Sequence, residues 1–76
     1  MTKLAPEACR AARAILRWST EDLARESSVA GTTINRLENG SPSRASTEAR
    51  LVATFAAHGV EILNGDAPGA RMTAKG

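Results

Sequence analysis

The sequence has little of what small domains often use for stability beyond an apolar core. Its 76 residues contain one cysteine, Cys9, one histidine, His58, one phenylalanine, one tryptophan and no tyrosine. A single cysteine excludes an intramolecular disulfide, and Cys9 with His58 gives too few soft ligands for a structural zinc site. No stretch approaches the roughly 18 apolar residues that span a bilayer. We therefore expect a domain without metal, cofactor or membrane contact.

The N-terminal segment lacks a secretory targeting signal. Its ten residues, MTKLAPEACR, contain no apolar core of the kind found in signal peptides. The single cysteine gives no sign of an oxidising compartment either. Together these features predict a cytoplasmic protein.

Large apolar side chains are also scarce. Alanine accounts for 15 of the 32 hydrophobic residues, so 17 larger ones remain to form a core. Small domains with a thin core often gain stability by self-association, and we therefore expect a homodimer. The abundance of alanine and the shortage of β-branched and aromatic residues predict a mainly α-helical fold.

The basic residues are mostly arginine. Eight of the ten basic residues are arginine, whose planar guanidinium makes bidentate contacts to phosphates and base edges. The net charge is only +2, however, and an ordinary solvated surface explains that charge equally well. The charge alone therefore does not show whether the partner is a nucleic acid.

Apolar residues spaced three and four apart predict four helices, separated by short polar segments. Pro6 suits the first position of the first helix, and Ser19 with Asp22 forms a capping-box pattern before the second. Asn39-Gly40 stops the third helix, and His58-Gly59 stops the fourth. The predicted helices cover residues 6–17, residues 20–27, residues 31 or 32 to 38, and a last segment that begins between 43 and 47.

The C-terminal residues follow a different pattern. Residues 60–63 alternate in the manner of a strand, Asn64-Gly65-Asp66 is typical of a turn, and residues 67–72 form a weak return strand. We therefore divide the chain into a helical domain, 1–59, and a C-terminal strand or hairpin with a frayed tail, 60–76.

The second and third predicted helices form a characteristic pair. Both are short, and a tight turn of a few residues joins them. Two helices that cross this closely need a small residue at the contact, which Ala24 supplies, and apolar residues that face inward. The inward positions are Leu23, Val29, Ile34 and Leu37. This spacing indicates a helix-turn-helix.

Specific residues strengthen this interpretation. The sequence resembles the lambda-repressor-like, Xre-type helix-turn-helix family over about residues 9–59. The resemblance is carried by the segment Ser19-Thr20-Glu21-Asp22-Leu23-Ala24-Arg25, by Val29, and by the segment Thr33-Ile34-Asn35-Arg36-Leu37-Glu38-Asn39-Gly40. The resemblance implies sequence-specific binding of double-stranded DNA by a dimer, usually a transcriptional repressor. The expected fold class is mainly α, a four-helix helix-turn-helix DNA-binding domain with a short C-terminal β-strand or hairpin.

The resemblance places the base-reading side chains at and after the start of the third helix. Ile34 and Leu37 face the core, so the neighbouring side chains are left to contact the major groove. Arg36 suits a bidentate contact to guanine, and Asn35 suits adenine or a phosphate. The expected base-reading residues are Thr32, Thr33, Asn35 and Arg36, with Gly31 beside them.

Contacts to the DNA backbone are expected on both sides of the third helix. The N-terminus of the second helix, at Ser19 and Thr20, presents backbone N–H groups to a phosphate. The resemblance further implies an ion pair between Arg13 and Glu38, which would fix the first helix to the third. A second stretch of phosphates is expected to meet the segment after the third helix, at Asn39, Ser41, Ser43 and Arg44.

Three sites depart from the family pattern. Thr20 replaces a longer glutamine and shortens a contact from the second helix. Ser28 replaces a turn glycine, so either Ser28 adopts the left-handed conformation or the turn shifts. Ala30-Gly31 replaces a polar N-cap and a long polar side chain. We therefore expect modest specificity per half-site.

Val60, Ile62 and Leu63 have two interpretations. They pack a hairpin onto their own domain, or they add a strand to the equivalent strand of a second copy and so form the dimer interface. We favour the second, because a two-stranded hairpin alone is marginally stable. Such a dimer would place two third helices in successive major grooves of a near-palindromic operator, about 34 Å apart.

Other conspicuous side chains have structural interpretations. Cys9 lies on the apolar stripe of the first helix, Trp18 suits a cover over the core, and His58 suits the negative end of the last helix. Arg10 and Arg17 either approach a DNA backbone or solubilise the first helix.

The sequence therefore predicts a dimeric repressor that acts by occupying a promoter, and that is associated with the nucleoid through DNA. Two alternatives remain: a protein-interaction module, such as an antitoxin-like or phage-control subunit, and an activator that contacts RNA polymerase. An activator surface would use Glu21, Asp22 and Glu26. The sequence offers no nucleophile-base pair, glycine-rich phosphate loop or metal cluster, so we do not expect an enzyme.

Overall fold

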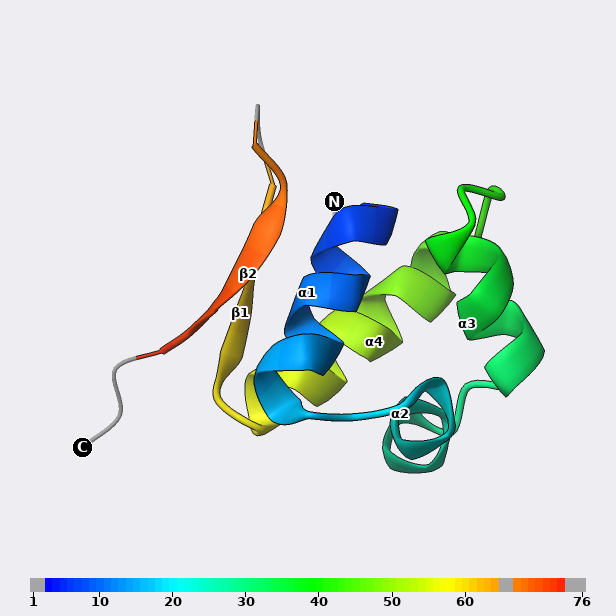
Figure 1. The fold of residues 1–76 in the computed structure, drawn as a ribbon. Helices are drawn as coiled ribbons and strands as arrows, with labels where there is room; N and C mark the ends of the chain where they lie inside the picture. Colours follow the sequence, from blue (N-terminus) through cyan, green and yellow to red (C-terminus); the bar gives the residue numbers. More distant parts are fainter. Residues whose placement is uncertain (1–2, 65–66, 74–76) are drawn as a thin grey trace.

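The computed structural model describes residues 3–64 and 67–73. Within these ranges the chain forms four helices and a two-stranded hairpin (Figure 1). The mainly helical fold with a C-terminal hairpin is confirmed. Gly65 and Asp66 of the predicted turn, and residues 74–76 of the predicted tail, lie outside the described residues. The elements are α1 (Pro6–Leu16), α2 (Thr20–Ser27), α3 (Gly31–Glu38), α4 (Ala45–Ala57), β1 (Val60–Leu63) and β2 (Gly69–Met72).

The core lies between the four helices and the hairpin. The predicted inward residues Leu23, Ile34 and Leu37 are buried, whereas Ala24 and Val29 are half-buried. α1, α4 and β1 add side chains to the same cluster, as does Leu4 before α1: Ala8, Cys9, Ala12, Leu51, Phe55 and Val60, while β2 contributes the half-buried Ala70.

Two apolar residues that continue the spacing of the first and fourth predicted helices, Leu16 and Ala56, are less buried than that spacing predicts. Ala56 is exposed, because the buried stripe of α4 is narrow and runs through Leu51 and Phe55, one turn apart. Leu16 is only half-buried, since α1 ends there and Arg17 turns the chain with a φ of +58°. The first helix is therefore one residue shorter than predicted.

The start of α2 has the predicted capping box. The Ser19 hydroxyl accepts a hydrogen bond from the Asp22 N–H at 3.0 Å, and the Asp22 carboxylate accepts one from the Ser19 N–H at 2.9 Å. Two N–H groups that the helix cannot satisfy itself are thereby paired.

The turn between α2 and α3 keeps its tight geometry without a glycine. Ser28 has a φ of +62°, so the left-handed alternative predicted from the sequence is the one adopted. Buried Ser27 supports the turn, because its hydroxyl donates to the Leu23 carbonyl at 2.6 Å and accepts from the Val29 N–H at 3.2 Å. The turn therefore stores strain at a single exposed residue.

Replacing Ser28 with glycine should stabilise the protein by about 0.5–1 kcal/mol, because the relieved left-handed strain exceeds the backbone entropy that glycine adds to the unfolded chain. Urea unfolding of both proteins measures the difference. Ser41→Gly is the matched control, since Ser41 is equally exposed and does not have a positive φ. A similar gain in both variants would show that strain at Ser28 is not the cause.

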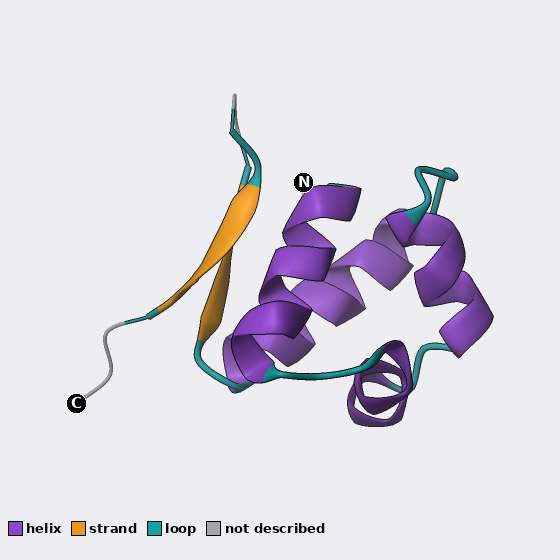
Figure 2. Cartoon of the chain, in the orientation of Figure 1, coloured by secondary structure: helices purple, strands orange, loops and turns teal. Residues whose placement is uncertain are grey.

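The hairpin closes one side of the helical core. β1 and β2 are antiparallel, with Val60 opposite Met72 and Glu61 opposite Arg71. They pack mainly on α1 and on the end of α4, and α3 lies on the opposite side of the molecule (Figures 1 and 2). The hairpin and the helix-turn-helix are therefore separate surfaces.

This arrangement corrects the expected role of β1. Val60 is 0% exposed and belongs to the core of its own domain, so its side chain is not available to a second copy. Ile62 and Leu63 are half-buried, and Ile62 packs against the same core. The strand pairs within the chain because the helices alone leave the core open on this side.

Trp18 is half-buried and covers part of the core beside the end of α4, as predicted. Its ring lies 6.2 Å from that of Phe55 in a stacked arrangement, and 4.8 Å from that of His58, edge to face. The Nε2 atom of His58 is 3.5 Å from a Glu26 carboxylate oxygen. These contacts join the end of α4 to α2, which adds to the role expected for His58 at the helix end.

Candidate nucleic-acid interface

The outer face of α3 is polar. Thr32, Asn35 and Arg36 are exposed and Thr33 is half-buried, whereas Ile34 and Leu37 of the same helix are in the core. The helical period therefore places the four expected base-reading side chains on the outward side of an otherwise anchored helix.

The N-terminus of α3 is open. No described side chain caps it, because the N-cap residue is Ala30. Gly31 follows without a side chain, and nothing lies within 4 Å of the position where its Cβ would be. The first N–H groups of the helix therefore face an unobstructed region, with the partial positive charge of a helix N-terminus.

The N-terminus of α4 lies beside α3 and is open in the same way. Its N-cap residue is Arg44, and no described side chain caps the helix. Two adjoining depressions run between the helices, and Thr33 and Thr47 line both of them. The further lining residues are Ser28, Val29, Ala30, Arg36, Pro42, Ser43, Arg44, Ser46 and Arg50. We call this surface the α3–α4 groove.

Three exposed arginines border the α3–α4 groove: Arg36 from α3, Arg44 before α4 and Arg50 from α4. Together with two open helix N-termini, they make the groove attractive to anions. The groove residues from α4, which are Ser46, Thr47 and Arg50, were not among the site residues predicted from the sequence. The sequence did indicate that residues 46 and 50 share a face, since they are one turn apart at the start of the helix.

Ser43, expected to contact a phosphate, has a partner within the chain. Its hydroxyl donates to the Glu48 carboxylate at 2.6 Å. A serine has one hydroxyl proton, so Ser43 would have to leave Glu48 to donate to a phosphate, and that contact stays a prediction. Asn39 and Ser41 are exposed after α3, and their contacts with DNA stay predictions.

The N-terminus of α2 is also less suited to a phosphate than expected. The Ser19 N–H is already bound by Asp22. That hydrogen bond, together with Arg25, lowers the pKa of the Asp22 carboxyl group and keeps it charged. With Glu21 beside it in the first turn, the end of α2 carries negative charge. A phosphate at Ser19 would have to displace Asp22, and Thr20 is half-buried, so the contacts expected at these two residues stay predictions.

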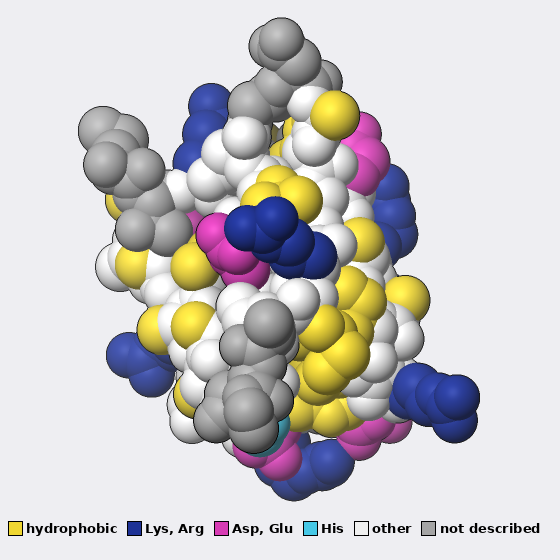
Figure 3. All heavy atoms as spheres, turned by 90° about the vertical axis from the view of Figure 1, so that its left-hand side faces the viewer, with side chains coloured by type: hydrophobic (Ala, Val, Ile, Leu, Met, Phe, Trp, Pro, Cys, Tyr) yellow, Lys and Arg dark blue, Asp and Glu magenta, His cyan; other side chains and the backbone are white. Residues whose placement is uncertain are grey.

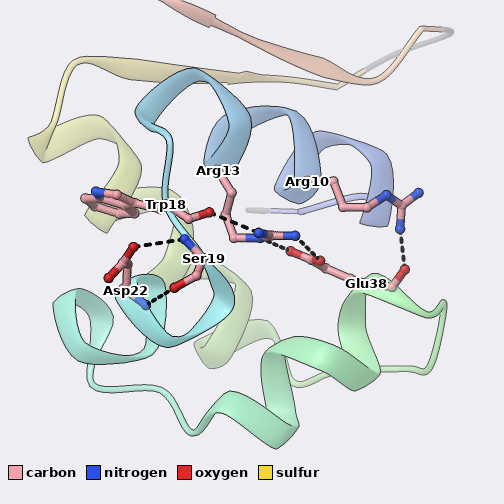
Figure 4. A network of polar contacts seen from close by, with 6 residues as sticks. All are labelled: Arg10, Arg13, Trp18, Ser19, Asp22 and Glu38. Atoms are coloured by element: carbon pink, nitrogen blue, oxygen red, sulfur yellow. Dashed lines mark hydrogen bonds and ion pairs between the residues drawn. The ribbon is translucent and has the colours of Figure 1, made fainter.

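α1 holds the end of α3 through Arg13 and Glu38, the pair that the family resemblance implied (Figure 4). The Arg13 Nε and Nη2 atoms each donate to one Glu38 carboxylate oxygen at 2.8 Å, and Nη1 donates to the Trp18 carbonyl at 3.0 Å. Arg10 donates to the backbone carbonyl of Glu38. Neither of the two interpretations of Arg10 predicted this contact, because it depends on how α1 packs against the end of α3.

Glu38 is charged although it is only 8% exposed. Burial, the largest single influence, would raise the pKa of its carboxyl group, but the hydrogen bonds from Arg13 and Cys9 and the charges of Arg13 and Arg10 together outweigh burial and hold that pKa below its ordinary value. Cys9 lies in the same region, and burial together with the Glu38 carboxylate raises the pKa of its thiol. The thiol therefore stays protonated and acts as a small core residue, as predicted.

The described residues show no other type of site. No three histidine, cysteine, aspartate or glutamate side chains among them are grouped so as to hold a metal ion. No helix within them has the length and apolar character needed to cross a membrane. Comparison with known protein families, curated proteins and solved structures finds no match.

Proposed function

We propose that this protein is a sequence-specific transcription regulator that binds double-stranded DNA by placing α3 in the major groove. The observation that carries the proposal is the α3–α4 groove. It brings Thr33 and Arg36 of α3 together with Arg44 and Arg50 and the uncapped start of α4, next to the uncapped start of α3 and its exposed residues Thr32 and Asn35. The fold beneath these groups is a helix-turn-helix, whose second helix fits a major groove about 12 Å wide.

The short side chains at the start of α3 suit close approach to the bases. Gly31, Thr32 and Thr33 let the helix backbone come near the groove floor, where threonine methyl groups meet thymine methyl groups. Arg36, one turn further along, has the length and planar end to bind guanine O6 and N7. Asn35 is positioned for adenine or for a phosphate beside the groove.

The other groups of the α3–α4 groove suit the DNA backbone. The open N-terminus of α4 directs N–H groups outward, and Arg44 and Arg50 add charge on either side of it. Such contacts fix the register of the protein on the duplex without reading its sequence. Repression follows from occupancy, because a bound dimer on a near-palindromic operator blocks a promoter.

Selection from random duplex DNA tests the proposal. The full chain should enrich fragments that share a short motif repeated in inverted orientation, and unlabelled fragments of that motif should compete for binding. Enrichment of no motif above the input library would overturn the proposal. If the protein binds all duplexes equally, the polar face of α3 does not read bases.

Arg50→Ala should weaken binding to every duplex by a similar factor and lower the slope of log affinity against log salt by about 1, because one phosphate contact is lost. Electrophoretic or fluorescence titrations at several salt concentrations measure that slope. Lys3→Ala is the matched control: it removes the same charge beside the hairpin, next to Asn64 and Pro68. Equal slopes for both variants would exclude a phosphate contact at Arg50.

A further inference from the structure

β2 is an open edge of the two-stranded sheet. β1 packs on the end of α4 as well as on α1, whereas β2 has β1 on one side and α1 beneath it. The described residues contain no third strand that continues the sheet beyond β2. An edge strand presents unpaired backbone N–H and C=O groups, and these can pair with another extended chain.

The register of the hairpin shows which backbone groups of β2 face outward. The Thr73 N–H donates to the Gly59 carbonyl at 2.8 Å, one step along from the opposed pair of Val60 and Met72. In antiparallel strands, opposed pairs that exchange hydrogen bonds alternate with pairs that direct their N–H and C=O groups away from each other. Ala70 and Met72 therefore direct theirs out of the sheet. Apart from the sheet, no backbone hydrogen bond between described residues includes either one.

The side of the sheet that faces the helices stays apolar up to this edge. Val60, Ala70 and Met72 share that side, because opposed residues and alternate residues of a strand point the same way. Val60 is in the core, Ala70 is half-buried and Met72 is 63% exposed. Ile15 of α1, on which β2 packs, is also half-buried. Figure 3, which faces the hairpin, shows a continuous group of hydrophobic side chains on this side of the molecule.

The other side of β2 carries a positive charge that is only partly engaged. Arg71 donates through its Nε atom to the Glu61 carboxylate at 2.9 Å, and both side chains are well exposed. A guanidinium has five N–H donors, so Arg71 has further donors for a second carboxylate. Both residues line a shallow depression at the surface.

This charge favours another protein over a second copy as the partner of the edge. If β2 paired with the β2 of a second copy so that Ala70 bonded to Met72, the two Arg71 residues would lie directly opposite each other. Their Cα atoms would be at the closer spacing of about 4.5 Å, where like charges destabilise the pair. A strand with an acidic residue at this position replaces the repulsion with an ion pair.

We propose that the edge of β2 binds an extended segment of another protein, which adds to the sheet as a third, antiparallel strand. The backbone of the segment bonds to Ala70 and Met72, and an acidic side chain meets Arg71. The residues on either side of that acidic one are apolar, and they cover Met72 and the apolar surface beside α1. Pro68, just before β2, has no N–H and ends the bonding edge, so the segment is short.

This binding does not rest on the proposed function. The hairpin and α3 lie on opposite sides of the molecule, so the segment and DNA would contact separate surfaces (Figure 1).

Amide hydrogen exchange of the full chain, followed by NMR with a synthetic peptide, tests the proposal. The probe has seven residues: a central glutamate between two valines, and two threonines at each end. Exchange of the Ala70 and Met72 amides should slow about tenfold when about nine-tenths of the chain is bound. A peptide with lysine in place of the glutamate should bind about tenfold more weakly, because it faces Arg71.

Two N-methylated peptides distinguish strand addition from a general apolar contact. In the proposed pairing, the N–H groups of both valines point to β2 and that of the glutamate points away. Methylation of both valine nitrogens should weaken binding at least about tenfold, because two hydrogen bonds are lost. Methylation of the glutamate nitrogen should leave binding nearly unchanged. Equal losses from the two peptides would overturn the proposal.

An exchange of charges tests the acidic partner without removing the ion pair of the hairpin. The double variant Glu61→Arg with Arg71→Glu keeps opposite charges across the strands but reverses the charge on β2. It should prefer the lysine peptide to the glutamate peptide. Glu21→Arg, a reversal on α2, is the control and should leave the preference unchanged. A folded double variant that still prefers the glutamate peptide would show that Arg71 does not select the segment.

The remaining outcomes are equally decisive. Ala70 and Met72 amides that are unaffected by the glutamate peptide would overturn the proposal. Protection of the same amides without peptide, rising with protein concentration, would show that a second copy occupies the edge and would also overturn it. These measurements contain no DNA, so their outcome is independent of the DNA selection.

Discussion

Glu38→Gln should lower the free energy of unfolding by about 3 kcal/mol, the low end of the range for breaking a buried ion pair. The glutamine keeps the size of the side chain but removes its charge. Arg13 would then retain its positive charge while only 20% exposed, without the two-pronged contact to Glu38. Urea unfolding measures the loss. We take the low end of the range because Arg13 is partly accessible to water.

Glu21→Gln is the matched control, because Glu21 is an exposed glutamate at the start of a helix, and its loss should cost less than about 1 kcal/mol. The two variants should also differ in acid. The pKa of Glu38 is lower in the folded than in the unfolded chain, so its stabilisation is complete above the ordinary glutamate pKa of about 4.3.

That stabilisation is lost as the pH falls through the lowered pKa of the folded state. The difference in urea midpoint between the natural chain and Glu38→Gln should therefore be largest near neutral pH and shrink at low pH. A difference that stays constant across this range would show that the charge of Glu38 does not contribute to stability.

Arg36→Ala should cost about 1–3 kcal/mol of binding to the selected operator and relax the base preference at one position per half-site. The reason is that, in the proposed complex, Arg36 would reach a base edge from the exposed face of α3. Repeating the selection with the variant identifies the relaxed position. On random duplexes the variant should bind nearly as well as the natural chain at low salt.

Arg44→Ala provides the comparison for Arg36. Arg44 lies before α4, so its loss should weaken all duplexes alike and flatten the salt dependence while leaving the selected motif unchanged. If the two variants lose the same base preference, the division between base reading and backbone contact is wrong.

Local signals were enough to predict the helix-turn-helix. Ser19 and Asp22 marked the start of α2 because a capping box depends only on residues three apart. Ile34 and Leu37 marked the buried side of α3 through the helical period alone. The strained turn at Ser28 was also foreseeable, since the alternatives for a non-glycine residue at that position are few.

The remaining features depend on contacts between distant segments. Val60 alternates with Glu61 in the same way whether β1 covers its own core or adds to a partner, so the pattern alone did not choose. The hydrogen bond from Ser43 to Glu48 and the contact of Arg10 with the end of α3 likewise follow from how the helices meet. The residues that α4 adds to the α3–α4 groove could not be predicted either, because they also depend on how the helices pack.

The two ends of α3 differ in their polar contacts. Its last residue, Glu38, is tied to α1 by Arg13 and Arg10, whereas its first residue, Gly31, follows an uncapped alanine and has no side chain. We therefore expect base recognition to be stricter near the C-terminal end of α3 than near its N-terminal end. If α3 reads DNA as proposed, the selected motif should be sharpest at the base nearest Arg36, close to the end of α3 that α1 holds, and should tolerate exchange at the bases nearest Thr32.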